Sequence, residues 1–549
     1  MNIKSVTNVI LLSGILINQG FAQEGPRRPP PQQPPGQPQP QPPGQPQPPS
    51  RTEPTNENID EQLQNIISQQ NILPIELSNI DVLPVSDQKV QLGKKLFFSK
   101  NLGGEQSAAC VSCHHPMLGG GDELSLSVGV DAVDELDNQA HDLLGHGRFN
   151  ENNNHPVVPR NAPSLFNIAL YNQGLFWDSR VERTRNGAIL TPDSTIDQQG
   201  RRRPDQNIPP GATLVNAQAR FPVTSGEEMR GSFAASSNNQ TLRSALVARL
   251  NNDIGNISTT WPSEFSQVYG DQEVTINRVF DAIGEYERSM LFVNNPWQSY
   301  LSGNTQAITD SQKQGAILFF TPSQQGGAGC VACHNGNNFS NSRHHLVAFP
   351  QIGVGKGNPS TTETSQDFGR ENITGNSNDR YHFRTPSLLN VAVTAPYGHT
   401  GAYQTLEEVV EHYNNPRRAI ERLFAARDNQ APINNNSPFC RLPQIEQLMV
   451  KHNVNCEDVF SDSFANSIEI ANYLQAARNN NIIASAPLRA RPNLSPFQVS
   501  LVVDFLHTLT DPCVESRECL NPWLLDDNDL ATFPDSQALP AKDKFGNVL

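Results

Sequence analysis

The stretch Cys110-Val111-Ser112-Cys113-His114 recurs later in the chain as Cys330-Val331-Ala332-Cys333-His334. The residues around each copy also repeat, in the same order and at similar spacing. Before each copy lie a short helical pattern and a glycine-rich loop, and after each lies a Pro-Ser-Leu block. These are Gly93-Lys94-Lys95-Leu96-Phe97-Phe98 and Ala162-Pro163-Ser164-Leu165 in the first half, and Gly315-Ala316-Ile317-Leu318-Phe319-Phe320 and Thr385-Pro386-Ser387-Leu388 in the second. The sequence therefore predicts an internal duplication.

The repeated Cys-x-x-Cys-His pattern is the attachment signature of c-type haem. Its two thiols bond covalently to the porphyrin vinyl groups, and the adjacent histidine binds the iron. A zinc site would need paired Cys-x-x-Cys motifs without the following histidine, and a thioredoxin-like site would need a βαβ context. We predict two haem c groups, attached through Cys110, Cys113, Cys330 and Cys333 and ligated by His114 and His334.

The other four cysteines, Cys440, Cys456, Cys513 and Cys519, form an even set, which is typical of disulfides in an oxidising compartment. Proximity along the chain favours Cys440 with Cys456 and Cys513 with Cys519. Four cysteines allow three pairings, so this choice stays open at the level of sequence.

Helix signals outnumber strand signals. Ser86 and Ser311 stand where N-caps belong before the two repeated helical patterns, and Ser495-Pro496 begins a third helix near the C-terminus. Alternating strand patterns are scarce. We expect a mostly α fold of two cytochrome c-like haem domains, with long loops and insertions.

The N-terminal residues indicate export. Residues 1–22 contain Lys4, a short apolar run and small residues, which is typical of a cleaved signal peptide. No later apolar run is long enough to cross a bilayer, so a transmembrane span is not expected.

Residues 23–72 are predicted to be a Pro/Gln-rich disordered linker, followed by haem domains at 73–300 and 301–549. The net charge of −15 argues against nucleic-acid binding.

The chain resembles the bacterial di-haem cytochrome c peroxidases and MauG. The resemblance extends from about Val90 to Asp511 and rests on blocks that occur in family order. Beside the two haem motifs, these blocks are Arg160-Asn161-Ala162-Pro163, Phe176-Trp177-Asp178, Glu228-Met229, Phe383-Arg384-Thr385-Pro386, Thr394-Ala395-Pro396-Tyr397 and Thr405-Leu406-Glu407-Glu408.

The resemblance implies roles for individual residues. Glu228 would be the acid–base group at the first haem, with Gln218 and Pro222 in the same pocket, because cleaving peroxide requires a proton to move between its two oxygens. Trp177 would relay electrons between the haems. A calcium ion would lie at Asn161, Thr394 and Pro396, whose oxygen atoms suit a hard cation. Read without the family, Glu228 could equally be an exposed carboxylate, and Trp177 would more often be a core residue. The calcium ligands and ordinary structural residues are then about equally plausible readings of Asn161, Thr394 and Pro396.

Tyr413 is the most diagnostic position. Thr405 and Glu408 form a capping box, and Leu406, Val410 and Tyr413 then fall on one helical face, so Tyr413 points inward. Peroxidases of the family place Met here, whereas MauG places Tyr. An anionic phenolate favours ferric and higher states of iron, so the second haem is expected to have a low reduction potential.

Departures from the family matter as well. Peroxidases whose first iron is blocked at rest carry a histidine where this chain has Val130, so the iron is expected to stand open. The nearby loop contains His141, His146 and His155, any of which could still reach it. Insertions at about 181–216 and 414–494 flank the distal sides of the two haems.

We therefore expect a periplasmic oxidoreductase that reduces hydrogen peroxide. Electrons would come from a small redox protein, such as a cytochrome c or a cupredoxin, or from a protein substrate, as in MauG. Two alternatives remain at this level. One is a di-haem oxygenase that uses O₂, and the other is an electron-transfer cytochrome with both irons six-coordinate.

Overall fold

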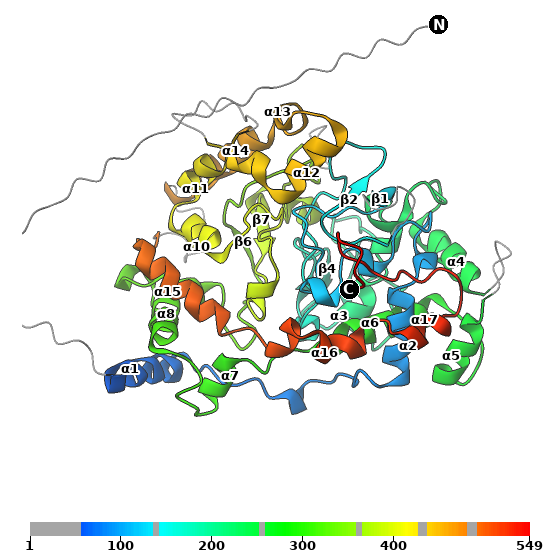
Figure 1. The fold of residues 1–549 in the computed structure, drawn as a ribbon, viewed down its shortest axis with the longest axis horizontal. Helices are drawn as coiled ribbons and strands as arrows, with labels where there is room; N and C mark the ends of the chain where they lie inside the picture. The colour runs from blue at the N-terminus through cyan, green and yellow to red at the C-terminus, as the bar shows by residue number, and fades with distance from the viewer. Residues whose placement is uncertain (1–55, 135–141, 252–258, 358–364, 426–435, 480–490) are drawn as a thin grey trace, which may run out of the picture. The chain divides into compact units, whose positions relative to one another are not determined.

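The computed structural model describes residues 56–134, 142–251, 259–357, 365–425, 436–479 and 491–549 (Figure 1). The predicted signal peptide, most of the predicted linker and His141 lie outside the described residues. Residues Pro54–Leu549 cluster as one unit. The described part is mainly helical, which confirms the predicted class.

Two helix pairs organise the two halves (Figure 1). In the first half, α2 (Gln88–Phe97) packs against α6 (Ile276–Ser289). The crossing is so close that a Cβ atom on Gly93 would lie 2.0 Å from the carbonyl oxygen of Ala282. In the second half, α8 (Asp310–Phe320) packs against α15 (Pro496–His507), and a Cβ on Gly315 would lie 1.9 Å from the carbonyl oxygen of Leu501. Both crossings therefore require glycine at the same position of the repeated pattern.

The blocks that follow the haem motifs also match. Asn167 and Asn390 both adopt a left-handed backbone, with φ of 61° and 62°. The Asn167 amide donates to the Met290 carbonyl, just after α6, and the Asn390 amide donates to the Leu509 carbonyl, just after α15. Each asparagine thus ties its block to the end of the helix that closes its half.

The predicted caps of the first two helices are wrong by one or two residues. Asp87, rather than Ser86, caps α2, because its carboxylate accepts from the Lys89 amide. Thr309 caps α8 and forms a capping box with Gln312, while Ser311 lies inside the helix and bonds to Asp504. The third predicted cap, Ser495, is confirmed.

The remaining described helices have between 4 and 17 residues, and the strands have two or three. The helices are α1 (Asn56–Gln69), α3 (Leu214–Gln218), α4 (Asn239–Leu250), α5 (Trp261–Tyr269), α7 (Pro296–Leu301), α9 (Glu371–Thr374), α10 (Leu406–Asn414), α11 (Pro416–Leu423), α12 (Pro443–His452), α13 (Cys456–Val459), α14 (Ser463–Asn479), α16 (Arg517–Leu520) and α17 (Asp527–Ala531). The strands form three small antiparallel sheets: β1 (Ala132–Asp134) with β2 (Arg148–Asn150); β3 (Gly174–Leu175), β4 (Val181–Arg183) and β5 (Ile189–Leu190) in order; and β6 (His344–Leu346) with β7 (His382–Arg384).

The predicted linker extends too far along the chain. Residues 56–69 form α1, which packs on α8 and buries the Leu63 side chain completely. Asp60 of this helix accepts hydrogen bonds from Tyr300 and Lys313, both at 2.9 Å. Apolar burial and these polar contacts stabilise the helix. The Pro- and Gln-rich composition of the preceding residues had indicated a linker instead.

The second domain boundary also needs correction. Residues after Pro512 pack on the core of the first half, where Leu520, Leu539 and Ala541 are buried. The Leu539 amide donates to the Phe98 carbonyl at 2.9 Å, and Lys94 pairs with Asp529 at 2.7 Å. The C-terminal tail therefore belongs structurally with residues 73–300.

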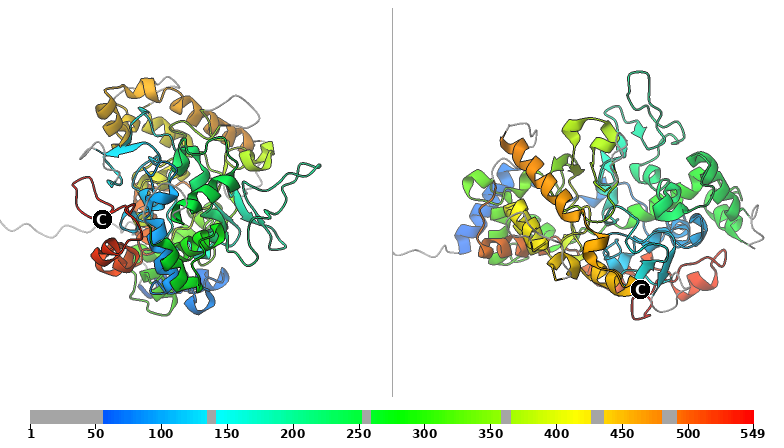
Figure 2. Two further views of the ribbon diagram at one scale, coloured as in Figure 1. Left: turned by 90° about the vertical axis from the view of Figure 1, so that its right-hand side faces the viewer. Right: turned by 90° about the horizontal axis from the view of Figure 1, so that it is seen from above.

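The two insertions take different forms. The segment from β4 to α3 projects away from the helices (Figure 2). The described part of the second insertion forms α11 to α14, with a Cys440–Cys456 disulfide. Together with the Cys513–Cys519 disulfide, it confirms the pairing favoured by proximity. Gln444 on α12 bonds to both backbone groups of Leu126, so this insertion contacts the first half.

Candidate haem sites

The two haem motifs present their histidines in the same way. Cys110–Ser112 and Cys330–Ala332 each form one short helical turn, which is followed by the histidine. His114 Nδ1 lies 3.2 Å from the Gly120 carbonyl, and His334 Nδ1 lies 3.0 Å from the Phe339 carbonyl. A donating Nδ1 leaves the Nε2 lone pair free for a metal. Burial lowers the pKa of each imidazole to about 4, which keeps both rings neutral.

The four motif cysteines suit covalent haem attachment. Among the cysteines of the described segments, these four are outside disulfides. The first motif opens into a cavity that is lined mainly by apolar side chains. Gln218 lines this cavity, and its buried amide oxygen has no hydrogen-bond partner among the described residues. Free thiols, neutral imidazoles and an apolar pocket with an unpartnered polar atom together fit a haem c group.

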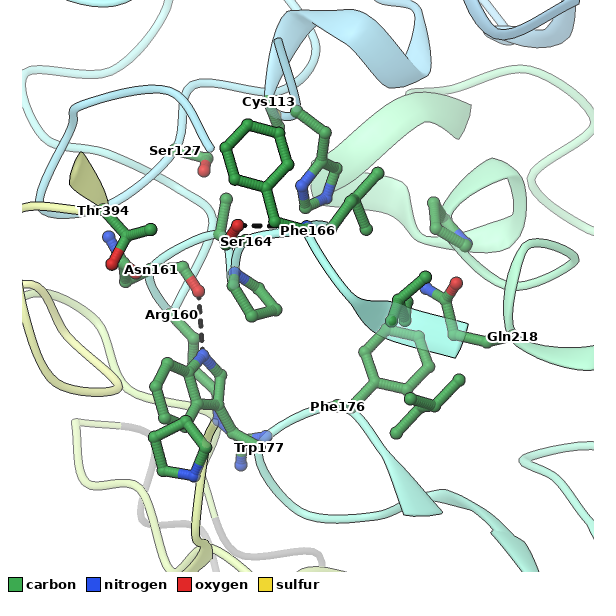
Figure 3. A pocket seen from close by; sticks show the side chains of 18 of the residues that line it. Cys113, Ser127, Arg160, Asn161, Ser164, Phe166, Phe176, Trp177, Gln218 and Thr394 are labelled. Atoms are coloured by element: carbon green, nitrogen blue, oxygen red, sulfur yellow. Dashed lines mark hydrogen bonds between the residues drawn. The ribbon is translucent and has the colours of Figure 1, made fainter. Parts of the chain in front are cut away.

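One cavity brings together the residues predicted for the first haem (Figure 3). Gln218 comes from the end of α3, Pro222 from the turn that follows and Glu228 from the short helical segment Gly226–Arg230. Trp177 comes from the turn between β3 and β4. All of them line the same cavity as Cys110, Cys113 and His114.

Glu228 lies at a charged edge of this cavity. Its carboxylate is 3.7 Å from the Arg180 guanidinium, and its side chain is 23% exposed. Arg180 in turn stacks over the Phe176 ring at 3.4 Å. Lys356 also lines this part of the cavity. Sequence reasoning did not single out either cation, because both lie in loops without a local pattern.

Trp177 connects the two repeated blocks. Its indole nitrogen donates to the Asn161 carbonyl at 2.9 Å, and its own carbonyl accepts from the Arg384 amide at 2.8 Å. Asn161 follows the first haem motif, whereas Arg384 follows the second. Trp177 is therefore held at the junction of the two halves.

A buried ion-pair cluster fixes this junction. Arg160 donates to Asp178 at 2.7 Å and to both oxygens of Asp367, at 2.6 and 2.8 Å. Burial opposes ionisation of Asp178, but Arg160 and Arg180 outweigh it and hold the pKa of that carboxyl below its usual range. Arg160 thus ties the residue after Trp177 to the second half of the chain.

The residues predicted to hold calcium lie on one side of the same cavity. Figure 3 shows Asn161 and Thr394 near each other, and Pro396 also lines this wall. Asn161 Nδ2 donates to the Leu124 carbonyl at 2.9 Å, which leaves its amide oxygen available. Among the described residues, no group of three or more His, Cys, Asp or Glu side chains could hold a metal ion. Any cation here would depend on neutral oxygen ligands.

Tyr413 lies beside the second haem motif. Thr405 and Glu408 form the predicted capping box at the start of α10, and Tyr413 is partly buried near the end of this helix. Burial and the nearby thiols of Cys333 and Cys330 raise the pKa of Tyr413. The Phe349 ring packs edge-on at 5.8 Å. The phenol and the haem-attachment cysteines therefore share one environment.

The two loop histidines that the structure describes, His146 and His155, lie outside the lining of the first haem cavity. His155 Nδ1 lies 3.0 Å from the Pro156 carbonyl. Val130 is buried, and its amide donates to the Glu227 carbonyl at 3.2 Å. This position thus lies next to the Glu228 segment and carries an aliphatic side chain that cannot bind iron.

Glu287 is a cavity residue that sequence reasoning missed. It follows Tyr286 on α6, and the matching residue in the second half, after Phe505, is Leu506. The Glu287 side chain is 5% exposed, and its Oε2 has no hydrogen-bond partner among the described residues. Burial raises the pKa of Glu287 to about 8. A comparison of the two repeats would have revealed this carboxyl.

Replacing Glu287 with glutamine is expected to remove a pH dependence of stability. Between the ordinary pKa of 4.5 and about 8, the folded state keeps a proton that the unfolded state releases, so stability falls as pH rises. The variant should match the wild type at pH 4 and exceed its free energy of unfolding by about 3 to 5 kcal/mol near pH 9. Guanidinium unfolding of the holoprotein at both pH values measures this, and a constant difference would contradict it.

Comparison with known proteins identifies the family. Residues 87–306 match the family model described as di-haem cytochrome c peroxidase. Cytochrome-c peroxidase IdrP1 of Pseudomonas sp. strain SCT is 27% identical over 351 residues, covering 60% of this chain and 73% of the relative. The methylamine utilization protein MauG of Methylophilus methylotrophus is 25% identical over 360 residues, covering 65% and 80%. The chain is thus related in sequence to the di-haem cytochrome c peroxidases and MauG.

These relatives place the chain among oxidoreductases that depend on hydrogen peroxide. A solved structure of a MauG-like protein associated with microbial copper homeostasis aligns with a TM-score of 0.47 at 20% identity, over 82% of this chain and 97% of the other. Within the described residues, no helix is long and apolar enough to span a membrane.

Proposed function

We propose that this chain is a periplasmic di-haem c-type enzyme that reduces hydrogen peroxide at the haem held by Cys110, Cys113 and His114. The observation that carries the proposal is the shared cavity, which joins this motif to Glu228 and Gln218. A neutral His114 that would ligate the haem iron and a carboxylate in the same pocket are the two protein groups that peroxide chemistry requires.

Glu228 performs the proton work. It accepts the proton of the inner peroxide oxygen and returns it to the outer oxygen, which then leaves as water. The unpartnered amide of Gln218 orients the peroxide, and Pro222 narrows the pocket beside it. Arg180, at 3.7 Å, forms an ion pair with the Glu228 carboxylate at the edge of the pocket. The haem supplies an iron that binds peroxide and takes up oxidising equivalents.

Trp177 relays electrons between the two haem sites. Its two hydrogen bonds connect the block after His114 with the block after His334, so the indole is held in contact with both halves. His334 and Tyr413 would be the protein ligands that hold the iron of the second haem. The phenol at this position makes the chain similar to MauG rather than to peroxidases that carry Met.

The two haem domains arose by duplication of one cytochrome c-like unit. The support is the pair of glycine-dependent helix crossings at Gly93 and Gly315, together with the left-handed Asn167 and Asn390 in equivalent hydrogen bonds. A calcium ion bound by Asn161, Thr394 and Pro396 would then stiffen the junction between the units.

The electron donor is a small periplasmic redox protein, such as a cytochrome c or a cupredoxin, or the side chains of a protein substrate. The chain's own net charge of −15 favours a cationic partner.

The test is to mix the diferric protein, as isolated, with one equivalent of peroxide and follow the haem spectrum. We expect rapid conversion without prior reduction, because Val130 replaces the histidine that would block the first iron. An inert spectrum, with both irons low-spin and six-coordinate, would instead support the electron-transfer cytochrome. Conversion by O₂ with a bound organic substrate, but not by peroxide, would support the oxygenase.

A further inference from the structure

We propose that Tyr381 and Tyr473 form an exit for oxidising equivalents, through which a small one-electron reductant such as a hydroquinone delivers electrons to the peroxide-oxidised enzyme. This inference rests on the proposed peroxidase function. It assigns a site to the second insertion, because Tyr473 and the carboxylate that assists Tyr381 both lie on α14.

Tyr381 is a buried phenol with a proton acceptor. Its side chain is 1% exposed, and its hydroxyl donates to Glu469 at 2.8 Å and also lies 2.7 Å from Gln366 Oε1. Burial and the Glu469 carboxylate raise the pKa of Tyr381 far above its usual value, so the phenol is protonated at rest. Oxidising such a phenol requires its proton to leave with the electron, and Glu469 is placed to take it.

The site is connected to both the interior and the surface. The Tyr381 ring stacks on Phe368 at 5.4 Å and meets the Tyr473 ring edge-on at 5.5 Å. Tyr473 is only partly buried, and Glu469 is exposed to solvent. An electron from outside can therefore enter at Tyr473, and a proton held by Glu469 can exchange with water.

A short length of β7 joins this site to Trp177. Tyr381 directly precedes β7, whose last residue, Arg384, donates its amide hydrogen to the Trp177 carbonyl at 2.8 Å. Phe383, between them, stacks on His399 with ring centroids 3.7 Å apart. Covalent bonds, one hydrogen bond and packed rings thus connect the tyrosine pair to the junction of the two haem sites.

The backbone of Tyr381 is in a strained, left-handed conformation. Tyr381 has φ of +60°, which is costly for a bulky residue and persists where the surrounding contacts enforce it. Its amide is held by the Phe368 carbonyl at 3.0 Å. The surrounding contacts therefore outweigh the local strain and hold this phenol between Glu469 and Tyr473.

Each step balances. Tyr381 gives one electron to the peroxide-oxidised enzyme and its proton to Glu469, which leaves a neutral phenoxyl radical. Tyr473 then gives one electron to this radical and its own proton to water, while Glu469 returns its proton to Tyr381. The reductant finally restores Tyr473 with one electron and one proton.

The experiment uses the full-length diferric holoprotein, one equivalent of peroxide and freeze-quench electron paramagnetic resonance. Wild type should form a tyrosyl radical that hydroquinone removes. Tyr381→Phe should lose the radical and the hydroquinone oxidation, and Tyr473→Phe should keep a radical that no longer decays with hydroquinone. Glu469→Gln should slow radical formation by about 10²-fold and introduce a solvent isotope effect.

Tyr269→Phe is the matched control, because Tyr269 is partly buried like Tyr473 and, like Tyr381, donates to a carboxylate, here Asp281 at 3.2 Å. It lies on α5 in the first half. It should behave as wild type. An inert haem spectrum in the wild type would overturn this inference together with the proposed function. A normal haem reaction, with radical and hydroquinone oxidation unchanged in Tyr381→Phe, would overturn this inference alone.

Discussion

Replacing Glu228 with glutamine is expected to slow peroxide consumption by about 10²- to 10⁴-fold while leaving two haem groups per chain. Glutamine keeps the size of the side chain but cannot accept the proton of the inner peroxide oxygen. The carboxylate does not contact either haem-attachment cysteine through a hydrogen bond in the described structure, so haem incorporation should be unaffected. Stopped-flow measurement of peroxide loss, with haem quantified by the pyridine haemochrome spectrum, gives both quantities.

The neighbouring residue provides a matched control. Glu227 is exposed and accepts from Ser225 at 2.9 Å, so Glu227→Gln removes the same charge from the same short helix without facing the cavity. This variant should retain the wild-type rate. Equal rates for Glu228→Gln and the wild type would remove Glu228 from its assigned role, and equal losses in both variants would mean that only the local charge matters.

Local sequence patterns predicted the features that depend on local chemistry. The haem motifs have fixed spacing, the capping box at Thr405 lies within one turn, and the disulfides join cysteines that are close along the chain. The repeat places Gly93 and Gly315 at the same position in each copy, and the structure adds that a helix crossing requires glycine at both. In each case the information lies within a few residues or within the comparison of the two copies.

Features that depend on distant contacts could not be predicted in this way. The tail around Leu539 packs on the first core, although the chain order places it after the second haem motif. Arg160 joins Asp178 and Asp367, which are separated by nearly 190 positions, and no periodic pattern links them. Helix α1 is stabilised by its contacts with α8, while its neighbours in sequence indicate a linker. The wrong linker bound and the wrong domain boundary therefore arise from tertiary contacts, which local propensity does not encode.

Replacing Tyr413 with methionine is expected to raise the reduction potential of the second haem by well over about 59 mV, the value that corresponds to tenfold in a one-electron equilibrium. A phenolate is an anionic oxygen ligand and stabilises ferric iron, whereas a thioether stabilises ferrous iron. The methionine side chain can occupy the place of the phenol between Phe349 and the Cys330/Cys333 turn, so α10 should remain in place. Spectroelectrochemical titration of the two haems measures the shift.

The control is Tyr403→Phe. Tyr403 belongs to the same aromatic group, and its hydroxyl bonds to His412 Nδ1 at 2.8 Å, while Phe349 packs against its ring. Loss of that hydroxyl should leave the potential nearly unchanged, which separates ligation from a general change in polarity. An unaltered potential and spectrum in Tyr413→Met would reject Tyr413 as a ligand. Because a higher potential should also make the enzyme depend on prior reduction before it reacts with peroxide, the variant tests whether the phenol is what separates this chain from peroxidases that carry methionine.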